Sequence, residues 1–79
     1  MLKLLDILFE KQDHVRNKSG KIIGSIMTQT NGRQVFRDRT GKLLGTYEPQ
    51  SNNTRDYTGK IIGRGNILAF LIKYYTWYY

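Results

Sequence analysis

The chain has 79 residues, with 13 Lys and Arg against 6 Asp and Glu, a formal charge of +7 and no cysteine. This length predicts one domain over residues 1–79, because separate cores need roughly 100 or more residues each. The lack of cysteine excludes disulfides, thiolate nucleophiles and cysteine-ligated metal sites, and it makes a cytoplasmic location the expectation. A chain this short buries only about 60% of its unfolded surface, so we expect a homo-oligomer.

Residues 1–12 predict a short amphipathic helix. Lys3, Asp6 and Glu10 recur at intervals of three and four residues and form one polar stripe on an otherwise apolar surface. Asp6 interrupts the apolar run that a secretory signal needs, so export is not expected. We expect this helix to cover an open face or end of a sheet; interfacial membrane contact is the alternative.

Residues 14–65 contain a repeat that occurs three times without gaps. Its copies are Arg16-Asn-Lys-Ser-Gly-Lys-Ile-Ile-Gly24, Arg37-Asp-Arg-Thr-Gly-Lys-Leu-Leu-Gly45 and Arg55-Asp-Tyr-Thr-Gly-Lys-Ile-Ile-Gly63. Each predicts a β-hairpin with a type I turn and a glycine bulge, since Asn or Asp accepts backbone hydrogen bonds and the first Gly tolerates the left-handed conformation. We therefore expect a mainly β protein built on an antiparallel β-hairpin repeat.

The segments between and within the copies support the same architecture. Thr30-Asn31-Gly32-Arg33 predicts a further hairpin turn, and Pro49 to Asn53 predicts a longer polar loop. The last glycine of each copy lies where a strand should continue, which indicates a bulge, a bend or close backbone approach. The aliphatic pair before it points to both faces of the sheet, so each strand should be partly covered on both sides.

Residues 66–79 form an apolar and aromatic segment that is shorter than the ~20 residues of a membrane-spanning helix. We expect it to be buried. Its β-branched and aromatic content favours a strand, with a helix over residues 67–73 as the alternative. The aromatic tail favours a core or subunit contact, and base stacking is the alternative.

The repeat pattern resembles a known type. An aromatic or aliphatic residue, then Arg-Asp, a turn, Gly-Lys, two aliphatic residues and Gly resemble the short β-repeats of uncharacterised bacterial proteins and are similar to the four-fold beta-flower type. The resemblance covers residues 14–65, and the first copy differs by having Asn17 in place of Asp. It implies a rolled or radial antiparallel β arrangement and no catalytic residues.

The residues that carry most enzyme chemistry are missing or already explained. His14 is the only histidine, so neither a standard zinc site nor a nucleophilic triad is expected. Asp38 and Asp56 occupy turn positions, and Gly-Lys-Ile-Ile-Gly lacks the Ser or Thr that ends a phosphate loop. We predict no enzyme activity, no cofactor and no metal.

The positive charge is concentrated in the repeat region, which contains ten cationic residues and only three carboxylates, Asp38, Glu48 and Asp56. The repeat places Arg and Lys at corresponding positions of neighbouring strands, which predicts a nucleic-acid or anion site. Its candidate residues are Arg16, Lys21, Arg37, Lys42, Arg55 and Lys60. Aromatic residues lie near them, namely Phe36, Tyr47 and Tyr57. The alternative is a set of solvated positions that discourage edge aggregation and pair with the two turn aspartates.

Three functions follow from these observations. The first is a non-enzymatic interaction or self-assembly module whose protein partner is unknown. The second is an electrostatic nucleic-acid-binding protein that uses the repeated arginines and lysines, since turn geometry explains the repeat's Asn, Asp and Gly but not these cations. The third is peripheral membrane association through the N-terminal helix.

Overall fold

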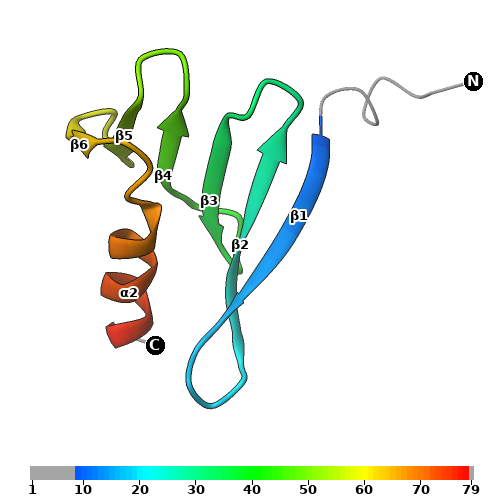
Figure 1. Ribbon diagram of the computed structural model, residues 1–79. Coiled ribbons are helices and arrows are strands. Elements are labelled where there is room, and N and C mark those ends of the chain that lie inside the picture. The colour runs from blue at the N-terminus through cyan, green and yellow to red at the C-terminus, as the bar shows by residue number, and fades with distance from the viewer. Residues whose placement is uncertain (1–8, 79) are drawn as a thin grey trace, which may run out of the picture.

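The computed structural model describes residues 9–78, which form six antiparallel strands in one open sheet, followed by a helix (Figure 1). The strands are β1 (Phe9–Arg16), β2 (Ile22–Gln29), β3 (Gln34–Asp38), β4 (Leu43–Glu48), β5 (Asn53–Asp56) and β6 (Ile61–Arg64); the helix is α2 (Leu68–Tyr78). The strands neighbour one another in chain order, so β1 and β6 are the two edges. The predicted mainly β, antiparallel hairpin architecture is confirmed; the sheet is open, where a rolled or radial one was predicted.

The N-terminal helix predicted over residues 1–12 is not seen in the part of the chain that the structure describes. Residues 1–8 lie outside the described residues, and residues 9–12 belong to β1, so the prediction is wrong for those four. The physical reason is long-range pairing: β1 pairs with β2 from Phe9 opposite Gln29 onward. Backbone hydrogen bonds to a neighbouring strand outweigh the local helical spacing of polar residues.

The three repeat turns have the predicted geometry. Gly20, Gly41 and Gly59 have φ values of 85°, 91° and 90°, the left-handed region that glycine enters without steric cost. Each glycine N–H donates to the carbonyl of the Asn or Asp three residues earlier. The Asn-Gly turn between β2 and β3 is also present, with a bond from the Gly32 N–H to the Gln29 carbonyl at 2.9 Å.

The second strand of each repeat hairpin, β1–β2, β3–β4 and β5–β6, contains a β-bulge next to its glycine. The β1–β2 register passes from Val15 opposite Gly24 to Arg16 opposite Ile22, which leaves Ile23 as the extra residue. The same shift recurs in the β3–β4 and β5–β6 pairs. Of the alternatives predicted at the second glycines, a bulge is confirmed, and a bulge bends its strand and increases the local twist.

The core lies between the sheet and α2, which runs back beside the strands from the end of β6 (Figure 1). Phe36 and Leu44 from the sheet contact Leu68 from the helix, and all three are buried. Phe36 also meets the ring of Tyr75 edge to face, with ring centroids 6.1 Å apart. Further helix residues on the same face pack against this cluster, namely Leu71 and Ile72.

The C-terminal segment is a helix, so the preference for a strand is wrong; the alternative of a helix over residues 67–73 is correct in type, and the helix continues to Tyr78. Gly65, with φ 79°, directly follows β6. The Asn66 side chain accepts a hydrogen bond from the Leu68 N–H at the start of α2. The segment is buried on one side only, because Phe70 and Tyr74 are exposed. Because the segment is apolar on all sides, its sequence does not show the spacing of three to four residues by which one side of the helix faces the sheet.

Candidate anion-binding end of the sheet

The turns that carry the predicted cations lie at the same end of the sheet. The turns over residues 17–21, 38–42 and 56–60 connect β1 to β2, β3 to β4 and β5 to β6. In a sheet whose antiparallel strands follow chain order, alternate turns lie at the same end. Arg16 is the last residue of β1, Arg37 and Arg55 are the second-to-last residues of β3 and β5, and each candidate lysine is the last residue of the turn that follows. We call these three turns and their preceding arginines the basic turn end.

The three arginines also lie on one face of the sheet, the face away from α2. The residue before each arginine faces the helix: Phe36 is in the core and Val15 packs against it. Thr54 is buried, and its hydroxyl binds the Gly65 carbonyl just before α2. Because side chains alternate along a strand, the arginine that follows each of these residues points to the opposite face.

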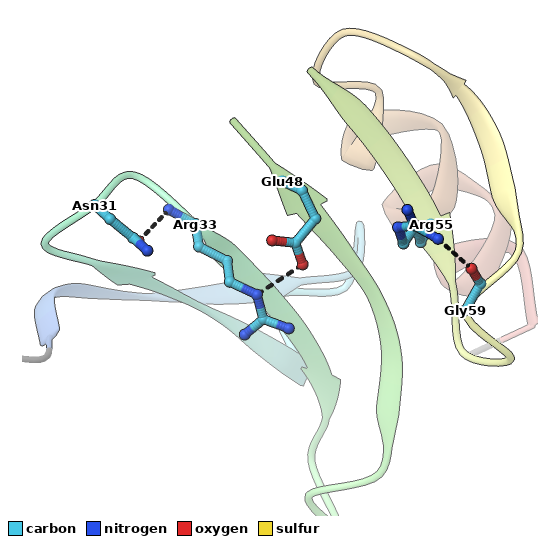
Figure 2. Close-up of polar contacts among 5 residues, drawn as sticks. All are labelled: Asn31, Arg33, Glu48, Arg55 and Gly59. Atoms are coloured by element: carbon cyan, nitrogen blue, oxygen red, sulfur yellow. Dashed lines mark hydrogen bonds and ion pairs between the residues drawn. The ribbon is translucent and has the colours of Figure 1, made fainter. Parts of the chain in front are cut away.

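Each repeat arginine is anchored to its own turn. Its Nη1 donates a hydrogen bond to the carbonyl oxygen of the turn glycine four residues later, as Figure 2 shows for Arg55 and Gly59. The three bonds join Arg16 to Gly20 (2.8 Å), Arg37 to Gly41 (3.0 Å) and Arg55 to Gly59 (2.8 Å). The prediction that turn geometry does not involve the arginines is therefore wrong. A guanidinium has five N–H donors, so this bond holds its position and leaves donors for a ligand.

The turn aspartates are occupied by the turns themselves. Asp38 Oδ1 accepts hydrogen bonds from the Thr40 N–H at 2.8 Å and the Lys42 N–H at 3.0 Å. A bond from the Thr40 hydroxyl lowers the pKa of Asp38, with help from these two N–H groups and the Lys42 charge and against a weaker effect of burial. Asp56 is arranged in the same way through Thr58 and Lys60, and its pKa is also lowered. Asn17 performs the same role with a neutral side chain, accepting from the Ser19 and Lys21 N–H groups.

An ion pair that the sequence did not predict lies away from the basic turn end. Arg33 Nε donates to Glu48 Oε2 at 2.7 Å, and both side chains are partly buried (Figure 2). A second ion pair joins Lys11 to Asp13. The one repeat-region carboxylate that is not used in a turn, Glu48, is thus paired at the opposite end of its strand. The basic turn end therefore keeps a net positive charge, with Asp38 and Asp56 as its carboxylates.

Of the three aromatic residues near the cations, one is available for stacking. Phe36 is fully buried. Tyr47 packs against the core and donates its hydroxyl hydrogen to Asn52 Oδ1 at 2.8 Å. Tyr57 is 58% exposed, and Lys42 Nζ lies 5.7 Å from its ring centroid. Tyr57 therefore presents an aromatic surface among the turn cations.

Within the described residues, no group of three or more His, Cys, Asp or Glu side chains is placed to hold a metal ion. No helix in the same range is long and apolar enough to cross a membrane. Comparisons of the chain with protein-family models, with curated proteins and with solved structures found no match.

Proposed function

We propose that this chain is a non-enzymatic interaction module that binds nucleic acid through the basic turn end. The observation that carries this proposal is the threefold recurrence of an arginine on one face of the sheet, each held by the carbonyl of its own turn glycine. Arginine forms charge-assisted, often bidentate, hydrogen bonds with phosphate oxygens. Holding the guanidinium in place beforehand reduces the side-chain entropy that binding would otherwise cost.

The spacing of the arginines favours a polymer over a single small anion. Ser25 on β2 lies opposite His14 on β1 and opposite Arg37 on β3. Arg37 is therefore at the same height in the sheet as His14, two residues before Arg16. Thr46 on β4 lies opposite both Val35 and Arg55, and the same offset results. Each arginine is thus displaced from the next by two strands and two residues, roughly 12 Å. Regularly spaced donors are suited to the regularly spaced phosphates of a nucleic acid.

The expected recognition is of the backbone, independent of sequence. Contacts to phosphates supply affinity and position, whereas base identity is read at base edges. Tyr57 adds an exposed ring that stacks on any base, because every base has a π face. Lys42, close to this ring, adds positive charge beside the same surface.

The experiment compares two double variants that remove the same charge. Fluorescence anisotropy with labelled single-stranded and duplex DNA and RNA, at ~50 mM salt, is measured for Arg37→Gln/Arg55→Gln and for Lys11→Gln/Lys73→Gln. Two lost charge-assisted contacts predict that the arginine pair weakens binding about tenfold or more. The lysine pair, on β1 and α2, should cost under threefold. Equal losses would contradict a localised site, and no binding of wild-type protein would contradict the function itself.

A further inference from the structure

The third repeat unit exposes a position that the first two bury. The units are the hairpins β1–β2, β3–β4 and β5–β6, and the bulged aliphatic residue of each is Ile23, Leu44 or Ile62. Ile23 is 1% exposed, Leu44 is 3% exposed and Ile62 is 38% exposed. The first two units are each followed by another hairpin, whereas β6 is an edge of the sheet. Leu44 is covered by Leu68 of α2 as well, whereas Ile62 lies on β6, beside which the described residues place no further hairpin.

The junctions between units inside the chain define how such a hairpin would sit. The last glycine of one unit lies opposite the aspartate of the next, as Gly24 opposite Asp38 and Gly45 opposite Asp56. A Cβ at Gly24 would lie 2.3 Å from the Arg37 carbonyl oxygen, so glycine is what permits this close approach. The third unit keeps a glycine at this position, Gly63, where the described residues place no following strand and a Cβ would instead lie 2.3 Å from Ile67 Cδ1.

We propose that β6 is a docking edge for β1 of a second copy of this chain, which adds in the register of the internal junctions. β1 is the other edge of the sheet; it ends in Arg16 and is followed by Asn17, where β3 and β5 present Arg and Asp. Gly63 then lies opposite the partner's Asn17, and the added hairpin covers Ile62. The contact is heterologous, so copies add head to tail and close into a ring or extend. It does not rest on the nucleic-acid proposal, although the partner's Arg16 belongs to both surfaces.

The same register places a repulsive pair in the contact. Arg64 occupies the position of Ser25 and Thr46 in the earlier units, where it would face the partner's Arg16. Like charges directly opposite one another destabilise a strand pair, and salt screens them. Association is therefore expected to be weak at low salt and to strengthen as salt is raised. Nucleic-acid binding has the opposite salt dependence.

The test measures the molar mass of the full chain by sedimentation velocity and light scattering without nucleic acid, from ~10 µM to ~1 mM protein in ~0.5 M salt. Wild-type protein should rise above the 9.3 kDa of one chain with increasing concentration. Arg64→Thr, which copies the residue of the second unit, should tighten association at least threefold. Ile62→Lys should keep the mass of one chain, and Phe70→Ser, on the exposed face of α2, should behave as wild type.

Three results would overturn the proposal. They are a wild-type mass that stays at one chain throughout, an Ile62→Lys variant that associates as well as wild type, and a loss of association in Phe70→Ser, which would assign the contact to α2. Circular dichroism verifies that Ile62→Lys is folded. Arg64→Thr supplies a gain of association that misfolding at residue 62 cannot imitate.

Discussion

Arg37 donates a hydrogen bond from Nη1 to the carbonyl oxygen of Gly41, four residues later, at 3.0 Å. The bond gives the arginine a structural role in its turn besides its charge. Arg37→Lys keeps the charge but loses the planar fork, so we expect the free energy of unfolding in urea to fall by about 0.5–1 kcal/mol. Arg39→Lys, within the same turn, is the control and should change stability little. Equal losses in the two variants would show that the turn bond contributes nothing.

The carboxylates of the turns predict a stability that declines in acid. The bond from the Thr40 hydroxyl holds the pKa of Asp38 below the ordinary value of 3.8, and Thr58 does the same for Asp56. The folded state thus favours the ionised form, and its stabilisation is fully present above pH 3.8 and is lost as the pH falls toward the lowered values. Asp38→Asn/Asp56→Asn copies Asn17 of the first turn.

We expect the double variant to stay folded at pH 7 and to lose less stability than wild type between pH 5 and about pH 2. Urea midpoints across this range provide the measurement. Parallel decline of the two proteins would mean that other carboxylates, such as Glu48 in its ion pair, account for the acid sensitivity.

Gly24 and Gly63, two of the glycines next to the bulges, should differ in their tolerance of alanine. A Cβ at Gly24 would lie 2.3 Å from a backbone atom, the Arg37 carbonyl oxygen, which cannot move without displacing β3. A Cβ at Gly63 would lie 2.3 Å from the flexible end of the Ile67 side chain. We expect Gly24→Ala to destabilise by about 2–3 kcal/mol and Gly63→Ala by about 1 kcal/mol or less. Thermal and urea unfolding rank the two, and the reverse order would argue against the close strand approach.

The hydroxyl of Thr54 ties the start of α2 to the sheet. It donates to the Gly65 carbonyl at 2.7 Å and accepts from the Ile67 N–H at 3.0 Å, and Thr54 is fully buried. Thr54→Val keeps the shape but leaves both backbone groups without this partner, at a cost of about 1–3 kcal/mol. We expect hydrogen exchange in α2 to accelerate. Thr46→Val, at a buried threonine on the other face, should leave α2 exchange unchanged; acceleration in both variants would remove the special role of Thr54.

Local chemistry made the turns and bulges predictable. A turn needs an acceptor such as Asp38 and a residue with positive φ such as Gly41, and both requirements are visible in nine residues of sequence. The two elements that were mispredicted depend on distant partners. Residues 9–12 are a strand because they pair with β2, and α2 is a helix whose apolar face is chosen by Phe36 and Leu44. Pairing and packing of this kind override local propensity.

The candidate site was predictable in its residues but not in its geometry. Once every connection is a short hairpin, strand order alone brings the three repeat turns to one end of the sheet. The bond from Arg55 to the Gly59 carbonyl depends on a side-chain conformation that spacing does not specify. The burial of Phe36 and exposure of Tyr57 likewise follow from which face α2 covers.

The salt dependence of nucleic-acid affinity tests the central claim most directly. If the three repeat arginines each contact a phosphate, the logarithm of the association constant for duplex DNA falls linearly with the logarithm of salt concentration, with a slope of about −3 or steeper. Arg37→Gln/Arg55→Gln should flatten this slope by about 2. Binding that is absent at ~50 mM salt, or an affinity that is unchanged between ~50 and ~200 mM salt, would contradict the account.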